Sequence, residues 1–404
     1  MLWTPLSLCC RSRPSAGGWQ PLRFDGGAFH LKGTAELARA LLVLRVCAWP
    51  PLVTHGLAFQ AWSQRLLGSR LSRTLLRASI YGQFVAGETA EEVRDCVQQL
   101  QALGLLPLLA VPTEEEPDST AKTSEAWYEG NLRTMLRCVD LSRALVDTRG
   151  PARNSLMQLK VTALASTRLC KELSAWIQRP AGSSQLSPER LAEAMDSGQN
   201  LRLSYLSADQ NQHLQASLSR LHHVAQETQE RLERDAEAAH KAGLAFGVKL
   251  VRGAYLEKER AMTQLHGKED CTQPDYEATS RSYSRCLELV LRRVSRHGPP
   301  CHLMVASHNE ESVRQATKRM WELGIPPDGP VCFGQLLGMC DHVSLALGQA
   351  GYVVYKSIPY GCLEEVIPYL IRRAQENRSV LQGVRREQEL LSQELWRRLL
   401  GRKV

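Results

Sequence analysis

Long apolar runs are missing from this chain of 404 residues. No window offers the roughly 18 uncharged apolar residues that a membrane-spanning helix needs. The most apolar stretch, residues 35–62, is interrupted by Arg39, Arg45 and the pair Pro50-Pro51. We therefore expect residues 35–62 to form a partly buried or membrane-apposed pair of helices.

Cysteine spacings that indicate zinc sites are also missing, although the chain holds twelve cysteines. There is no Cys-x-x-Cys and no Cys/His quartet with the spacing of a zinc site. Cys96, Cys138 and Cys286 lie on expected apolar faces, where a buried free thiol is the usual state. This pattern favours a reducing compartment and argues against a structural metal.

Acidic residues are scarce in one region only. Residues 1–80 hold ten Lys and Arg against Asp25 and Glu36, which accounts for the whole net charge of +8. The remainder is neutral and lacks the electrostatic footprint of a nucleic-acid-binding protein. Residues 1–24 contain no acid and carry Arg11, Arg13 and Arg23 among Ser, Leu and Trp. That composition predicts a mitochondrial transit peptide more readily than a secretory signal, because no long apolar region follows the first basic residues.

A Gly-x-Gly-x-x-Gly sequence after a strand is missing too, so a doubly wound dinucleotide fold is unsupported. Six runs are typical of buried strands, at residues 105–111, 156–163, 246–252, 302–306, 331–336 and 352–357. Helical patterns separate most of them, which predicts parallel βα units. Polar residues recur where these runs end, and a (β/α)8 barrel builds its chemistry on that face.

Several helices can be placed from caps and periodicity. Thr89 and Glu92 form a capping-box signature for a helix that ends at Gly104. Further helices are expected at residues 126–146, 227–241, 275–297 and 368–377. Residues 385–400 carry leucines at helical spacing and are expected to pack on the barrel, with membrane docking as the weaker alternative.

The stretch 246–255 combines an alternating strand with two cations, Lys249 and Arg252, followed by Gly253 and Ala254. Small residues allow a flat ligand to approach the backbone closely, and the cations suit an anionic one. An edge strand with solvated Lys and Arg side chains explains this stretch equally well when it is taken alone.

Further cations fall where an anion could bind. Lys160 lies inside an apolar strand, which is costly unless the ammonium is paired. Pro368 suits the first turn of a helix in which Glu376 can hold either Arg372 or Arg373. Both guanidinium groups can converge on one carboxylate. A solvated Arg-Arg-Glu face is the more common arrangement for this motif alone.

Four motifs together change that balance. They are Lys-Leu-Val-Arg-Gly-Ala-Tyr at 249–255, Ser-His-Asn at 307–309, Phe-Gly-Gln-Leu-Leu-Gly-Met at 333–339 and Tyr-Leu-Ile-Arg-Arg-x-x-Glu-Asn at 369–377. Their order and spacing resemble the proline dehydrogenase family, and in particular its vertebrate hydroxyproline branch. The resemblance runs from about residue 81 to residue 383.

The resemblance implies a distorted (β/α)8 TIM-type barrel that holds FAD noncovalently. It implies oxidation of a proline-like imino acid by hydride transfer to the flavin, with the electrons passed to a quinone at the mitochondrial inner membrane. By the same resemblance, Lys160, Arg372 and Arg373 would bind the substrate carboxylate, and Tyr255 and Leu336 would pack on its ring. Residues implied to contact or brace FAD are Lys249, Arg252, Gly253, Ala254, Leu256, Thr279, His308, Asn309 and Glu376.

Ser357 bears on the choice of substrate. The family's plain proline enzymes place a tyrosine at this position, beside the substrate ring. Serine leaves room for a ring hydroxyl and can hydrogen-bond it. We therefore predict oxidation of trans-4-hydroxy-L-proline to 1-pyrroline-3-hydroxy-5-carboxylate, with L-proline as the alternative main substrate.

The chain departs from the family between the strand of Lys160 and the strand of Lys249. The family has two strands there, whereas residues 218–226 run directly into the helical pattern at 227–232. We expect about six of eight barrel strands, and hence an incomplete barrel over 81–383 between a helical region at 25–80 and a C-terminal helix at 384–404. A catalytically impaired, shortened variant of the enzyme is therefore the alternative function. A barrel acting on phosphorylated substrates is less favoured, because residues 358–361 make a poor phosphate loop.

Overall fold

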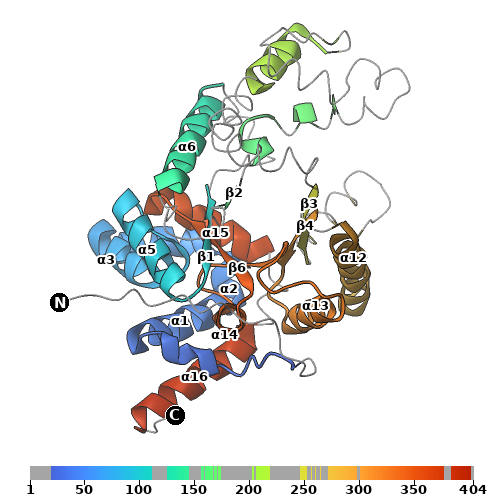
Figure 1. Cartoon of the computed structure of the whole chain (residues 1–404). Helices are drawn as coiled ribbons and strands as arrows, with labels where there is room; N and C mark the ends of the chain where they lie inside the picture. Colours follow the sequence, from blue (N-terminus) through green and yellow to red (C-terminus); the bar gives the residue numbers. More distant parts are fainter. Residues whose placement is uncertain are drawn as a thin grey trace, which may run out of the picture.

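Six parallel strands form one sheet in a computed structural model of the chain (Figure 1). The structure describes residues 20–111, 125–144, 156–173 and 203–218 with short gaps, 246–252, single residues within 256–264, and 272–297, 301–376 and 384–401. The strand order is β2-β1-β6-β5-β4-β3. The strands are β1 (Leu106–Ala110), β2 (Leu156–Gln158), β3 (Phe246–Val251), β4 (Cys301–Ala306), β5 (Val331–Leu336) and β6 (Val353–Pro359).

The six strands lie where the apolar runs predicted them, but β2 is shorter than expected. It stops at Gln158, and the chain forms a 3₁₀ turn at Val161–Ala163 instead of continuing the strand to residue 163. The backbone N–H of Leu164 donates to the carbonyl of Val161, and Asn131 from a neighbouring helix donates to the carbonyl of Ala163. These bonds replace the strand pairing that residues 161–163 would have made, so Lys160 stands at the end of β2.

Helices cover the sheet, and the core lies between the two. α5 (Ala90–Ala102) begins with the predicted capping box, in which the Glu92 N–H donates to the Thr89 hydroxyl and the Glu92 carboxylate accepts from the Thr89 N–H. Four further helices lie around the sheet: α6 (Glu125–Ala144), α12 (Tyr276–His297), α13 (Glu310–Glu322) and α14 (Asp341–Gln349) (Figure 1). The central strands supply fully buried side chains, among them Leu109, Val305, Phe333 and Val354.

α15 (Leu363–Glu376) begins five residues before the expected start at Pro368. Pro368 therefore lies inside the helix and not in its first turn. A proline in that place cannot donate to the carbonyl four residues earlier, which belongs to Glu364. Glu364 is exposed, so water can satisfy that carbonyl and the helix can tolerate the proline.

The N-terminal helices and the last helix pack against each other. α1 (Thr34–Cys47) lies along α16 (Val384–Leu399), where the Gln388 amide donates to the carbonyl of Leu44 over 2.9 Å (Figure 1). Arg398 donates to the carbonyls of Phe29 and Lys32, each over 3.0 Å. α16 thus confirms the helix predicted at 385–400 and its packing on the protein.

α2 (Pro50–Thr54) and α3 (Gly56–Leu76) complete the N-terminal region. α3 exposes a row of large apolar side chains, including Trp62 and Leu66 at 60% and 62% exposure. Within the described residues, no helix combines the length and the apolar character that crossing a membrane requires. The predicted transit peptide at 1–24, apart from residues 20–24, and the predicted helix at 227–241 lie outside the described residues.

Candidate functional site

The carboxyl ends of all six strands lie at the same edge of the sheet, because every described pairing is parallel. Several of the predicted site residues follow or end a strand at this edge. Lys160 follows β2, Arg252 follows β3, His308 follows β4, and Leu336 ends β5. The fold therefore gathers residues that are far apart in the sequence.

Two of the predicted carboxylate-binding cations meet around one tyrosine. The Lys160 Nζ lies 4.9 Å from the centre of the Tyr369 ring, and the Arg373 Cζ lies 5.5 Å from the same ring. Cation–π contacts of this kind hold both cations against one ring. Arg372, which directly precedes Arg373 on α15, is half-buried. Three positive side chains at the end of β2 and on α15 thus suit an anionic ligand.

Two of the three residues expected beside the substrate ring are direct neighbours in the sheet. Leu336 and Ser357 are register partners between β5 and β6, and the Leu337 N–H donates to the Ser357 carbonyl over 3.0 Å. Partners in a parallel pair project to the same face of the sheet. Leu336 is 39% exposed and Ser357 is half-buried, so both side chains are accessible at this edge.

A second group of predicted residues is joined by Tyr276, the first residue of α12. The Arg252 guanidinium lies 4.8 Å from the centre of the Tyr276 ring and donates to the Ser280 hydroxyl over 2.9 Å. The side-chain amide of Asn309 donates to the Tyr276 hydroxyl over 2.8 Å. Thr279, on the same turn, hydrogen-bonds the carbonyl of Asp275 and is half-buried. Arg252 and Asn309 therefore meet at Tyr276 beyond the ends of β3 and β4, and Thr279 lies on the same turn of α12.

Lys249 lies on the exposed face of β3, which it shares with Val251, a residue 47% exposed. Partial burial of its ammonium group lowers the pKa of Lys249 below its ordinary value. A lysine that is partly desolvated but reachable from the strand ends is suited to an anionic ligand.

His308 stands beside Leu336 at the ends of β4 and β5. The backbone N–H of Leu336 lies 3.1 Å from the His308 Nε2. Burial, and then the positive charge of Lys356, lower the pKa of His308 to about 3. The imidazole is therefore neutral at physiological pH.

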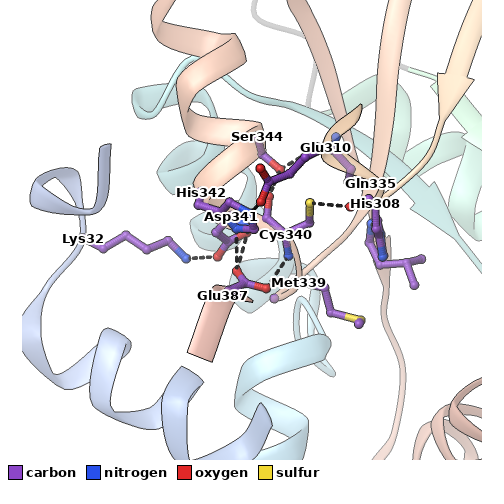
Figure 2. A network of polar contacts seen from close by, with 12 residues as sticks. Lys32, His308, Glu310, Gln335, Met339, Cys340, Asp341, His342, Ser344 and Glu387 are labelled. Carbon is purple, nitrogen blue, oxygen red and sulfur yellow. Dashed lines mark hydrogen bonds and ion pairs between the residues drawn. The ribbon is translucent and has the colours of Figure 1, made fainter. Parts of the chain in front are cut away.

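A buried network of charges supports this end of β5 (Figure 2). The Lys356 ammonium pairs with the Asp341 carboxylate over 2.8 Å, and Lys32 pairs with the other oxygen of the same carboxylate. Burial alone would raise the pKa of Asp341, but the two ammonium groups outweigh it and hold the pKa well below its usual range. Glu387, on α16, accepts from the backbone N–H groups of Cys340 and Asp341, both over 2.8 Å, and so caps α14.

His342 extends the network on the other side. Its Nε2 lies 3.0 Å from a carboxylate oxygen of Glu310, and its Nδ1 lies 3.8 Å from Glu387. Burial would lower the pKa of His342, but its contacts with Glu310 and Glu387 raise it to about 9. His342 is therefore a cation at neutral pH. Figure 2 shows Asp341, His342 and Glu387 converging at the start of α14.

The loop between β5 and α14 also packs closely against Gln83. Gly338 has φ of 74°, and a Cβ there would lie 2.1 Å from the carbonyl oxygen of Gln83. The Gln83 side chain in turn donates to the Gly338 carbonyl over 2.8 Å. A glycine is required at this position both for its backbone conformation and for this close approach.

Four predicted site residues cannot be placed fully. Gly253, Ala254 and Tyr255 lie outside the described residues, and so does the side chain of Glu376. Leu256 is described as a half-buried helical residue.

Three residues of the site carried no predicted role. They are Tyr276, Lys356 and Tyr369. Tyr369 stands in a motif with Arg372 and Arg373, and that proximity was the available signal. Lys356 is a lysine inside an apolar strand, the pattern that singled out Lys160. Within the described part of the chain, no three or more His, Cys, Asp or Glu residues are arranged to hold a metal ion.

Comparison with known proteins places the chain among flavoenzymes. The profile of the family described as proline dehydrogenase matches residues 206–386. Mouse hydroxyproline dehydrogenase is 79% identical over 454 positions, which span 100% of both chains, and human hydroxyproline dehydrogenase is 71% identical over 99% of this chain and 98% of that protein. Human proline dehydrogenase 1, mitochondrial, is 31% identical over 92% of this chain and 88% of its own length. The family uses FAD.

Among solved structures, a crystal structure of proline utilization A from Bdellovibrio bacteriovorus superposes with a TM-score of 0.53 at 18% identity. It matches 90% of this chain, which spans 40% of that longer chain. This likeness concerns the fold alone, an α/β arrangement like that of the proline dehydrogenase part of proline utilization A. The identity of 79% to the mouse protein and of 71% to the human protein extends over essentially the full length of each. The chain therefore belongs to the proline dehydrogenase family.

Proposed function

We propose that this chain is an FAD-dependent dehydrogenase of trans-4-hydroxy-L-proline that yields 1-pyrroline-3-hydroxy-5-carboxylate. The observation that carries the proposal is its 79% identity, over the full length, to mouse hydroxyproline dehydrogenase. The small side chain of Ser357 beside Leu336 supports the hydroxylated substrate, because it leaves space and a hydrogen-bonding group at the edge of the sheet. L-proline is the alternative substrate.

The substrate carboxylate would bind to Lys160, Arg372 and Arg373. Tyr369 supports this assignment, because its ring holds the Lys160 and Arg373 cations within about 5 to 6 Å of its centre. Two cations that contact the same ring can both reach an anion bound beside it. Leu336 and Tyr255 would pack on the substrate ring, and Ser357 would face its hydroxyl group.

The cations on and just after β3 fit a dinucleotide cofactor. Arg252 and Lys249 can neutralise a pyrophosphate, and Thr279 and Asn309 offer polar atoms beside them. When bound, FAD supplies the oxidant that accepts a hydride from the ring carbon of the substrate. The remaining residues proposed to contact or brace FAD are Gly253, Ala254, Leu256, His308 and Glu376.

A (β/α)8 barrel with two strands absent is our proposal for the architecture. Among the described residues, β2 and β3 stand at the two ends of the strand order, which is where two further strands would close the ring. The alignment with the mouse protein spans 454 positions while this chain has 404 residues, so at least 50 positions face a gap in this chain. Val251, on β3, is 47% exposed, as expected of a strand that has lost its neighbour.

This arrangement favours a second candidate function, a catalytically impaired variant of the same enzyme. The two missing strands would supply part of the wall around the flavin. A chain without them keeps its substrate cations, yet its affinity for FAD would fall.

A mitochondrial location, transfer of electrons to a quinone and contact with the inner membrane complete the proposal. The similar human proline dehydrogenase is named as mitochondrial. Residues 37–87 contain six arginines and no acid, and α3 exposes Trp62, Leu66 and Leu71. An apolar helix face flanked by arginines suits the surface of an anionic membrane.

The deciding experiment compares the purified full chain with mouse hydroxyproline dehydrogenase prepared in the same way. Flavin absorbance gives the bound FAD per chain, and reduction of a soluble quinone gives kcat/KM for hydroxyproline and for proline. Stoichiometric FAD with a preference for hydroxyproline supports the enzyme. Substoichiometric FAD and lost turnover, next to an active mouse protein, support the impaired variant. A flavin-loaded chain that prefers proline contradicts the proposed substrate.

A further inference from the structure

One hydrogen bond fixes the position of the proton on His308. The donor to its Nε2 is the backbone N–H of Leu336, at 3.1 Å. A backbone amide can only donate, so the Nε2 must be the acceptor, and the neutral ring then carries its proton on Nδ1. Within the described residues, no protein group is recorded in a hydrogen bond with that Nδ1.

The loop that begins at Leu336 is held in turn by Lys356. The Lys356 ammonium donates to the carbonyl of Leu336 over 3.2 Å and to the carbonyl of Met339 over 2.7 Å. Its third contact is the Asp341 carboxylate at 2.8 Å. An ammonium group has three donors, and these contacts use all of them. One side chain, only 1% exposed, thus ties both ends of the loop 336–339 to the first turn of α14.

Lys356 also acts on His308 through its charge. A buried positive group nearby opposes protonation of the imidazole, and burial of the ring acts in the same direction. The Asp341 carboxylate opposes this effect on the pKa of His308 and His342 adds to it, and burial with the two cations prevails. The ring therefore stays neutral, and its Nε2 stays an acceptor.

We propose that Lys356 is a positioning residue that, through the loop 336–339, keeps His308 neutral with its proton on Nδ1. The ring then offers one N–H donor to the bound flavin and no positive charge. This inference deepens the proposed function and rests on it for the identity of the acceptor. The tautomer itself can be tested on the protein without FAD.

The first test is ¹⁵N NMR of the full chain, labelled at histidine and free of FAD. The two ring nitrogens of a neutral histidine differ strongly in chemical shift according to which one is protonated. We expect His308 to show a protonated Nδ1 and an unprotonated Nε2, unchanged from pH 6 to pH 8. A proton on Nε2, a mixture of tautomers or a protonated ring in this range overturns the proposal.

The second test separates Lys356 from the rest of the buried network. Lys356→Met removes the loop contacts, whereas Lys32→Met removes the other cation on Asp341 and touches neither carbonyl. We expect the His308 tautomer to become mixed in the first variant and to stay fixed in the second. The same tautomer in both variants, each shown to be folded by circular dichroism, contradicts a positioning role.

A third test needs no change at Lys356 and so survives if that variant fails to fold. In His308→Asn the amide lies near the place of Nδ1, and in His308→Gln it lies near the place of Nε2. His308→Asn keeps a donor toward the flavin and loses the partner of the Leu336 amide, and His308→Gln does the reverse. We expect FAD to bind about tenfold more weakly to the Gln variant than to the Asn variant, the value of one hydrogen bond.

Equal affinities, or tighter binding by the Gln variant, overturn the flavin part of the inference. If the unmodified chain binds no FAD, the proposed function fails, while the NMR measurement on the same sample still decides the tautomer. The two failures are thus distinguishable.

Discussion

Lys356 in the middle of β6 and Asp341 at the start of α14 form an ion pair of 2.8 Å whose side chains are 1% and 8% exposed. Asp341 also binds Lys32, which precedes α1. His342, which follows Asp341 in the chain, is a third cation and faces the carboxylates of Glu310 and Glu387. Segments from the start and from the last quarter of the sequence thus meet in one buried and balanced cluster.

Removing one member of this pair should destabilise the fold strongly. Asp341→Asn leaves two buried ammonium groups without a counter-charge, and breaking a buried pair in this way costs about 3 to 5 kcal/mol. Urea unfolding measures the change in the free energy of unfolding. The matched control is Arg386→Ala, which breaks the exposed pair with Glu389 and should cost less than about 1 kcal/mol. Similar losses in the two variants would mean that the buried network contributes no more than a surface pair.

Stability should fall as the pH rises from about 6.5 to about 9, because of His342. Its pKa is raised from an ordinary value of 6.5 to about 9 in the folded protein. A raised pKa means that the imidazolium stabilises the fold fully below about pH 6.5, and this stabilisation is lost as the pH rises through the folded value. Urea unfolding at pH 7 and pH 10 measures the loss. His342→Gln should show a smaller difference between the two pH values, and an equal one would exclude His342 as the source.

Asn309 should show separable contributions to stability and to cofactor binding. Its carbonyl oxygen caps α13 by accepting from the Ser312 N–H over 2.9 Å, and its amide donates to Tyr276. Asn309→Ala should cost about 1 kcal/mol in the free energy of unfolding, whereas Asn309→Asp keeps the cap and the stability. Both variants should bind FAD more weakly. Asn309→Ala loses the bond to Tyr276, and Asn309→Asp, which can still accept from the Tyr276 hydroxyl, places a negative charge beside Arg252.

Tyr276→Phe is the control for that contact, because it removes the hydroxyl without touching Asn309. In an FAD titration, the affinity of Tyr276→Phe for FAD should lie between that of the unmodified chain and that of Asn309→Asp. Unchanged affinity for FAD in Tyr276→Phe and in Asn309→Ala, the two variants that lose the bond between Asn309 and Tyr276, would show that this bond does not serve the cofactor.

Ser357→Tyr should shift the substrate preference toward proline. The larger ring would fill the space beside Leu336, its register partner, and exclude a substrate hydroxyl. The ratio of kcat/KM for hydroxyproline to that for proline should fall by about tenfold or more. Ser357→Ala keeps the space and removes only the hydrogen bond, so its ratio should fall less. An unchanged ratio in the tyrosine variant would remove Ser357 from the specificity site.

The periodicity of the sequence was sufficient to predict the position of all six strands. Runs such as 331–336 are apolar, short and bounded by breakers, and a parallel sheet buried on both faces needs that pattern. The error at 156–163 arose because Val161 and Ala163 suit a strand by residue type, while the bond from Asn131 selects a turn. That bond depends on tertiary structure and leaves no local signal.

The candidate site was predictable in part for a similar reason. Lys160, Leu336 and Ser357 lie at strand ends, so the fold class alone brings them to one edge. Tyr276 was missed because its role depends on Arg252 and Asn309, which approach it only after α12 has packed on β3 and β4. The pairing of Lys356 with Asp341 likewise joins residues whose spacing in the sequence carries no recognised motif.

The cap that Glu387 places on α14 sets an order of events during synthesis. Glu387 follows Asp341 by 46 positions, so the ribosome has already released β5, α14 and β6 before the carboxylate that holds their junction is made. Until α16 emerges, the N–H groups of Cys340 and Asp341 have no such partner. The loop beside the proposed flavin is therefore among the last parts of a nascent chain to become rigid, and a polypeptide cut short before residue 387 lacks the group that fixes it.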